Sequence, residues 1–177
     1  RPTVLTDKGV VTAVRVDMGK PFLEADDVPA RCAKAVVDRP LLLPNGEIVR
    51  VTSLRLGVPH TIIFVNDALS APVERLGPMV ERDPFYPQGT NVNFVSRLDE
   101  NSYRIRTWER GCGPTLACGT GACSAAVAGI LNGDPRQVKR LLLPLGELTI
   151  DWAKDEHVYM TGPAAEKEGT LREGLAV

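Results

Sequence analysis

Residues 120–131 carry no charged side chain, and most of their side chains are small. This stretch predicts a helix, which ends at the turn-forming run Asn132-Gly133-Asp134-Pro135. A helix that is apolar on every side must be surrounded by protein. Its small side chains allow a sheet to approach closely on all sides. We therefore predict an α+β domain in which a β-sheet is rolled around this central helix.

Most of the remaining sequence has the alternating pattern and turn signals of short β-strands. The predicted strands cover residues 10–16, 41–43, 48–56, 61–65, 91–95, 103–109, 138–143, 147–152 and 157–160. Asn45-Gly46 marks one hairpin, because a type I′ turn needs two residues with positive φ, and residues 99–101 mark another. The expected sheet is therefore mainly antiparallel.

A second helix is predicted over residues 70–82, with Ser70 as its N-cap. Its apolar stripe consists of Val73, Leu76, Met79 and Val80. Gly77-Pro78 weakens this prediction, because a proline inside a helix removes a backbone hydrogen bond.

Composition limits the class of protein. The chain has 177 residues, of which 44% are hydrophobic, and this is enough for one domain, predicted over residues 1–165. The net charge of −1 and the lack of a basic cluster argue against nucleic-acid partners. No apolar run approaches the roughly 20 residues that span a membrane, and no signal peptide is visible. We expect a cytoplasmic protein; the absence of a starting Met suggests that the chain begins partway along a longer product.

Four cysteines, Cys32, Cys112, Cys118 and Cys123, are too few and too closely grouped for a disulfide framework in this chain. The last three are separated by five and then four residues, unlike the about two to four typical of structural zinc pairs. We therefore expect reduced thiols and no metal site. Cys123 lies inside the apolar helix, where packing accounts for it best.

Cys118 immediately precedes the apolar helix in a glycine-rich turn. Free N–H groups and the helix dipole at such a position favour the thiolate, so a lowered pKa is expected for this thiol. The amides of Gly119 and Thr120 offer a seat for a carboxylate. The alternative is that Cys118 is a small core hydrophobe, and the local physics leaves both interpretations open.

Five motifs occur in a characteristic order along the chain. They are Gly57-Val58-Pro59-His60, Gly89-Thr90-Asn91-Val92-Asn93-Phe94, Trp108-Glu109-Arg110-Gly111, Thr115-Leu116-Ala117-Cys118-Gly119-Thr120-Gly121-Ala122-Cys123 and Met160-Thr161-Gly162-Pro163-Ala164. Together they closely resemble the C-terminal half of diaminopimelate epimerase, from about residue 17 to residue 171. The long cysteine motif preceded by Glu-Arg-Gly is the most specific of them.

The resemblance implies one of two pseudo-symmetric halves, each a sheet rolled around a central helix, with the active site in the cleft between them. It implies an isomerase that interconverts LL- and meso-diaminopimelate for lysine and peptidoglycan synthesis, without pyridoxal phosphate or any other cofactor. One cysteine removes the α-proton as a thiolate, and a second returns a proton to the opposite face. Residues 166–177 would form a tail that returns toward the N-terminal domain, and homodimers are expected.

Site roles follow from the same resemblance. Cys118 would be the acid/base of this half, and the amides of Gly119 and Thr120 would bind the α-carboxylate. His60 would lie near the two cysteines and assist their proton balance. Without the motif, His60 is better explained as a satisfied, half-buried histidine.

Three further residues would contact the substrate. Glu109 is expected to take part in catalysis and binding, and Arg110 would pair with the distal carboxylate through its planar guanidinium. Asn91 would hydrogen-bond that same end. The alternatives are an exposed ion pair at the end of a strand for the first two residues and a turn residue for Asn91.

The chain departs from the family pattern in ways that matter for function. The first catalytic cysteine, in a Cys-Gly-Asn-Gly motif, is absent, so the chain alone should not epimerise anything. A missing N-terminal domain on the same or a separate chain would supply it; otherwise this is a non-catalytic binding or assembly domain. Val58 replaces a substrate-binding Asn, which opens the alternative of a racemase for another amino acid, and Pro114 replaces a usual glutamate.

Overall fold

The computed structural model describes residues 2–164, so the predicted tail at 166–177 lies outside the described residues. The strands are β1 (Pro2–Asp7), β2 (Val10–Asp17), β3 (Val36–Leu42), β4 (Ile48–Leu56), β5 (Val58–Phe64), β6 (Asn91–Asp99), β7 (Ser102–Glu109), β8 (Gly113–Thr115), β9 (Lys139–Leu143), β10 (Gly146–Trp152) and β11 (Val158–Pro163). The helices are α1 (Val73–Glu81) and α2 (Gly119–Leu131). This composition confirms the predicted α+β class.

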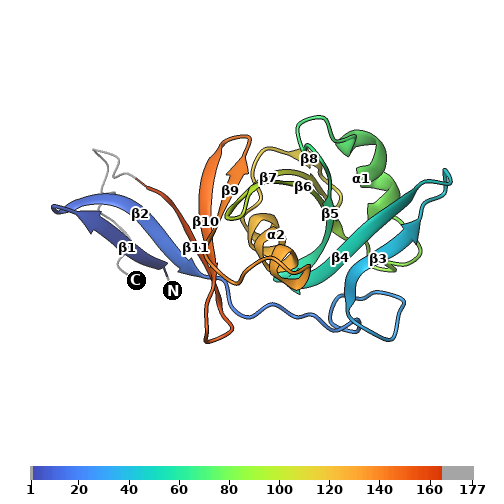
Figure 1. Cartoon of the computed structure of the whole chain (residues 1–177), viewed down its shortest axis with the longest axis horizontal. Helices are drawn as coiled ribbons and strands as arrows, with labels where there is room; N and C mark the ends of the chain where they lie inside the picture. Colours follow the sequence, from blue (N-terminus) through green and yellow to red (C-terminus); the bar gives the residue numbers. More distant parts are fainter. Residues whose placement is uncertain (1, 165–177) are drawn as a thin grey trace, which may run out of the picture.

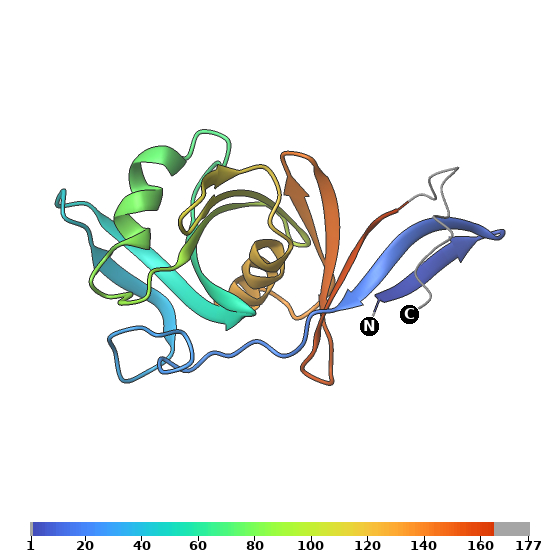
Figure 2. The same cartoon turned by 180° about the vertical axis from the view of Figure 1, so that it is seen from behind.

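All strands belong to one sheet, in the order β1-β2-β11-β10-β9-β7-β6-β5-β4-β3, and β8 pairs with β7 off this path. The sheet curves around α2, and the β1–β2 hairpin extends away from the curved part (Figure 1, Figure 2). Two pairings, β5 with β6 and β7 with β9, are parallel, and the others are antiparallel. The sheet is therefore mainly antiparallel, as predicted.

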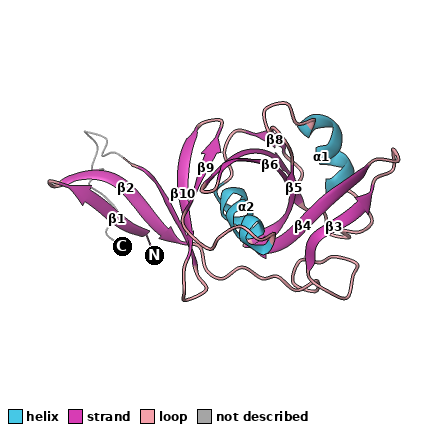
Figure 3. Ribbon diagram, viewed as in Figure 1, coloured by secondary structure: helices cyan, strands magenta, loops and turns pink. Residues whose placement is uncertain are grey.

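Helix α2 begins at Gly119, one residue before the predicted start, and ends at the predicted Leu131. Its residues 121–129 are all buried, and α2 contacts β4, β5, β6, β7, β9, β10 and β11 (Figure 3). Its alanines form a core cluster with Leu54, Ile62 and Ile150 from the surrounding strands. Because the helix surface is made of short side chains, strands from different parts of the chain can all approach its backbone.

Helix α1 lies on the outer side of the sheet, where it contacts β6, β7 and β8. The helix begins at Val73, so the predicted start at Ser70 was wrong; the Ser70 hydroxyl instead donates to the carbonyl of Asp67. Pro72 occupies the N-cap, and a proline disfavours helical geometry in the residue before it, which fixes the start of the helix. Pro78 is tolerated inside the helix.

Two strands were missed by the sequence patterns, and one was placed too late. Every residue of β1 is exposed, so the strand has no buried face to produce an alternation. β8 has three residues, too few for a pattern. β3 begins at Val36, before the predicted 41–43, and its register shifts between Val36 and Arg39. The hairpin at Asn45-Gly46 was predicted correctly, but its turn is not of type I′. Gly46 has φ of 85° and its N–H donates to Leu43 O, whereas Asn45 does not have a positive φ.

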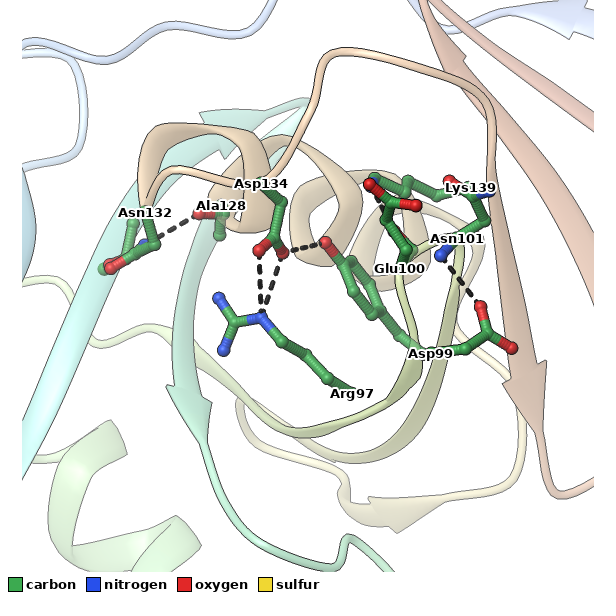
Figure 4. Close-up of polar contacts among 10 residues, drawn as sticks. Arg97, Asp99, Glu100, Asn101, Ala128, Asn132, Asp134 and Lys139 are labelled. Carbon is green, nitrogen blue, oxygen red and sulfur yellow. Dashed lines mark hydrogen bonds and ion pairs between the residues drawn. The ribbon is translucent and has the colours of Figure 1, made fainter.

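A partly buried polar cluster lies at the C-terminal end of α2 (Figure 4). Asp134 accepts hydrogen bonds from the Tyr103 hydroxyl and from Arg97 Nε, the latter at 3.0 Å. Lys139 is fully buried, and its Nζ donates to Glu100 O at 2.7 Å. These contacts fix the helix at the end opposite to Cys118. Within residues 2–164, neither helix is long and apolar enough to cross a membrane.

Candidate active site

Cys118 is the N-cap residue of α2, with the extended backbone (φ −142°, ψ 102°) that this position requires. Its Sγ accepts a hydrogen bond from Gly121 N at 3.4 Å and lies 3.5 Å from Thr120 Oγ1. A Cβ on Gly121 would lie 3.1 Å from this sulfur and 2.6 Å from Asn93 Oδ1. Only glycine at position 121 therefore lets the cysteine fold back over the helix start.

The pKa of Cys118 is raised, so the lowered value predicted from the helix start was wrong. Burial of the thiol is the main cause, and it outweighs the opposing hydrogen bonds from Thr120 and Gly121. The negative charge of Glu109 raises this pKa further. At neutral pH, Cys118 therefore rests as a thiol that carries its proton.

His60 lies on β5, fully buried. Its Nε2 is 3.0 Å from Thr120 Oγ1, and its Nδ1 is 3.1 Å from Asn93 Nδ2. Burial lowers the pKa of His60 to about 3, so the imidazole is neutral at physiological pH. The hydroxyl of Thr120 therefore lies between His60 and the sulfur of Cys118.

Glu109 ends β7 beside Cys118, and its influence on the thiol pKa places its charge near the sulfur. Thr115 Oγ1 donates to Glu109 Oε1 at 2.7 Å. The pairing of β7 with β8 sets Glu109 opposite Gly113 and so brings Thr115 back toward the carboxylate. The short strand β8 thus orients the charge that faces Cys118.

Asn91 is buried at the start of β6, where both ends of its amide contact the backbone. Its Nδ2 donates to Pro59 O at 3.1 Å, and its Oδ1 accepts from Arg110 N at 2.8 Å. Pro59 and Arg110 are the chain neighbours of His60 and Glu109. Asn91 therefore links β5, which carries His60, to the end of β7, which carries Glu109. The family resemblance implies a substrate contact for this same amide.

Arg110 is directed away from this group. Its Nη1 donates to Gln88 O at 2.6 Å, and a Cβ on Gly89 would lie 2.9 Å from Arg110 Cδ. The side chain lines a separate depression of about 380 Å³ together with Arg31 and Arg82. The structure thus brings Cys118 together with its helix-start neighbours, His60 and Glu109, while the Arg110 side chain lies outside this group.

Gly119 provides a second close approach at the helix start. A Cβ at this position would lie 3.0 Å from Met160 Sδ on β11. The motif that begins with Met160 therefore packs directly against the residue that follows Cys118. Across residues 2–164, no three His, Cys, Asp or Glu side chains gather as potential metal ligands.

Sequence reasoning missed two residues of this network. Asn93 was noted only as part of a motif, yet it contacts His60 and accepts a hydrogen bond from Thr107 Oγ1 at 3.0 Å. Thr115 was likewise noted only as part of a motif. The available signal was the spacing of Asn91 and Asn93, because residues two apart in a strand point to the same face.

The family model and the similar proteins of known family agree with one another. A family model described as diaminopimelate epimerase matches residues 52–166. A diaminopimelate epimerase from Moorella thermoacetica is 47% identical over 168 residues, which cover 94% of this chain and 60% of that protein. The one from Pelotomaculum thermopropionicum is 43% identical over 165 residues, which cover 93% of this chain and 59% of that protein. The chain spans about three fifths of the length of these relatives.

Solved structures support the same fold. A probable proline racemase from Agrobacterium radiobacter has a TM-score of 0.61 and 17% identity, over 100% of this chain and 61% of that chain. A hydroxyproline epimerase from Agrobacterium vitis has a TM-score of 0.57 and 15% identity, over 92% of this chain and 52% of that chain. At these identities the likeness concerns the fold alone. With the family match across most of the chain, the sequence comparison is decisive: this chain belongs to the diaminopimelate epimerase family.

Proposed function

We propose that this chain is the C-terminal catalytic half of a diaminopimelate epimerase that interconverts LL- and meso-diaminopimelate. The observation that carries the proposal is the position of Cys118 as the N-cap of α2, inside the segment that the family model matches. The missing half would contribute a second cysteine and complete a pseudo-symmetric pair of rolled sheets. The reaction would serve lysine and peptidoglycan synthesis in the cytoplasm and need no cofactor, and the whole protein would form a homodimer.

The resting thiol suits one of the two roles in this chemistry. The partner cysteine, as a thiolate, takes the α-proton, and the electron pair of the broken C–H bond stays on the substrate as a carbanion. The carbanion then takes the proton of the Cys118 S–H on the opposite face, so this half ends the turnover as a thiolate. Each cysteine changes its protonation state once, and no proton is gained or lost overall.

The backbone N–H groups that follow Cys118 could stabilise the negative charge that develops on the substrate carboxylate. The amides of Gly119 and Thr120 lie in the first turn of α2, where N–H groups lack partners within the helix. Aimed at an α-carboxylate, they would hold it and stabilise its enolate form. Glu109 and His60 would set the proton balance of Cys118. Arg110 and Asn91 would bind the distal end after a rearrangement of the contacts they make here.

Val58 supports a second candidate, a racemase for another amino acid. This residue lies at the start of β5, two positions before His60, and its side chain is 39% exposed. A valine offers no hydrogen bond to a polar distal group. Proline racemase and hydroxyproline epimerase, which share this fold, are named for substrates without a second carboxylate.

The test joins this chain to a segment carrying the Cys-Gly-Asn-Gly cysteine and measures α-proton exchange in deuterated water. We expect exchange with LL-diaminopimelate, reduced about 100- to 10,000-fold by Cys118→Ser. Cys112→Ser is the matched control, because this cysteine is exposed, and it should retain full exchange. Exchange with proline but not diaminopimelate would favour the second candidate. No exchange with any amino acid would leave a non-catalytic binding or assembly domain.

A further inference from the structure

A continuous line of hydrogen-bonding side chains leads from the middle of β7 to the sulfur of Cys118. Thr107 Oγ1 donates to Asn93 Oδ1 at 3.0 Å, and Asn93 Nδ2 lies 3.1 Å from His60 Nδ1. His60 Nε2 lies 3.0 Å from Thr120 Oγ1, which in turn lies 3.5 Å from Cys118 Sγ. Asn93, His60 and Thr107 are buried, so these groups depend on one another for partners.

The direction of this line is set at Asn93. Because its oxygen accepts from Thr107, its NH₂ group faces His60, and an amide NH₂ can only donate. His60 Nδ1 must therefore accept and carry no hydrogen. A neutral imidazole has a single N–H, so the hydrogen of His60 lies on Nε2 and is donated to Thr120 Oγ1.

This arrangement decides what Thr120 offers to the sulfur. Its oxygen already accepts from His60, and its one hydroxyl hydrogen remains available for Cys118 Sγ. We propose that Asn93 is a positioning residue: its amide selects the Nε2–H form of His60 and thereby makes Thr120 a hydrogen-bond donor toward Cys118. In the opposite tautomer, Thr120 would donate to His60 and could only accept from the thiol.

The Thr120 hydroxyl matters as a donor because no cationic side chain lies near the sulfur of Cys118 in the described part of the chain. The titratable groups near Cys118 are Glu109 on β7 and Cys123 on α2, and His60 lies beyond Thr120. None of these groups is a cation at neutral pH. When Cys118 gives up its proton, the hydroxyl of Thr120 and the amide of Gly121 stabilise the thiolate. The importance of this for turnover rests on the proposed function, whereas the tautomer itself is a property of the chain alone.

Nitrogen-15 NMR of the imidazoles in the full 177-residue chain tests the tautomer directly. The chain has two histidines, and His157→Gln identifies the signals of His60. We expect the hydrogen of His60 on Nε2 and an unprotonated Nδ1. In Asn93→Asp, the carboxylate can only accept, so the hydrogen should move to Nδ1. An Nδ1–H form in the unmodified chain would overturn the proposal, even if the variant failed to fold.

A pH–rate profile of Cys118 alkylation tests whether the effect passes through Thr120. The background is Cys32→Ser with Cys112→Ser, since Cys123 is fully buried. Asn93→Asp and Thr120→Val should each slow alkylation about tenfold at pH 8, with the plateau at high pH retained, because a hydrogen bond to the charged sulfur is lost. Thr120→Ser keeps the hydroxyl and should keep the original profile.

The double variant separates this mechanism from the charge that Asn93→Asp introduces. If the effect travels through Thr120, adding Asn93→Asp to Thr120→Val slows alkylation little further. Fully additive slowing would overturn the proposal, because it would mean that the new carboxylate acts directly on the thiol. Both experiments report on atoms of this chain and need no turnover, so a failure of the proposed epimerase activity would leave their outcome unchanged.

Discussion

The ring of Tyr103 occupies the space that a side chain at position 129 of α2 would need. A Cβ on Gly129 would lie 2.7 Å from Tyr103 Cζ. The hydroxyl of the same tyrosine donates to Asp134, just beyond the end of the helix. Tyr103 thus contacts helix α2 and the residue beyond it at the end opposite to Cys118.

Gly129→Ala should therefore destabilise the protein, although alanine favours helix more than glycine does. The overlap with Tyr103 is well under 3.0 Å and should cost about 2–3 kcal/mol, the upper part of the range for overpacking, partly offset by about 1 kcal/mol of helix propensity. We expect a net loss of about 1–2 kcal/mol in the free energy of unfolding, measured by urea denaturation. Adding Tyr103→Phe removes the hydroxyl and should recover part of the loss. A Gly129→Ala variant as stable as the original would contradict the proposed fit.

Replacing Glu109 should make Cys118 more reactive. The carboxylate raises the pKa of this thiol, so Glu109→Gln should lower that pKa and increase the thiolate fraction at any pH below it. Alkylation at pH 8 should become a few-fold faster. Glu100→Gln is the matched control, since Glu100 lies in the β6–β7 turn at the opposite end of the strand. Slower alkylation of Glu109→Gln would show that the carboxylate acts in the opposite sense.

Stability should fall in mild acid because of His60. Its pKa is about 3 in the folded chain and about 6.5 when unfolded, so the unfolded state binds more protons between these values. The free energy of unfolding should be about 2 kcal/mol lower at pH 5 than at pH 8. His60→Asn should have lower stability at pH 8 but lose this dependence. An unchanged slope in the variant would assign the dependence to other groups.

Asn91 should act as a structural tie, whatever else it binds. Asn91→Ala removes both of its backbone contacts and should cost about 1–3 kcal/mol, because it leaves Pro59 O and Arg110 N without these partners. Asn91→Asp keeps an acceptor for Arg110 N and loses only the donor to Pro59. Hydrogen exchange of the Arg110 amide should therefore accelerate in the alanine variant and stay slow in the aspartate variant. Equal acceleration in both would refute the tie.

The sequence was a good guide where a local pattern has only one structural solution. An uncharged run of small residues can only form a covered helix, and α2 with Cys118 at its start follows from it. The Asn45-Gly46 hairpin was found where these two turn residues placed it, although the turn is not the expected type I′, since only Gly46 of the pair has a positive φ. The start of α1 was misplaced because Pro72, rather than the capping preference of Ser70, sets it.

The hydrogen bonds around Cys118 could not be predicted from local patterns, because they depend on pairings between distant strands. The parallel register of β5 with β6 sets His60 opposite Asn91, and no local pattern specifies this pairing. The pKa of Cys118 illustrates the same limit. The helix start argued for a lowered value, but burial and Glu109, which comes from another element, determine the sign.

The β1–β2 hairpin forms one edge of the sheet. Within the described part of the chain, β1 is the outermost strand, with one row of backbone groups free to pair with an added strand. Its Pro2 is opposite Val16 on β2, which is opposite Met160 on β11. Met160 packs against Gly119, the residue after Cys118. A strand added at the outer edge of β1 would therefore extend a row of paired residues that ends at Gly119, next to Cys118.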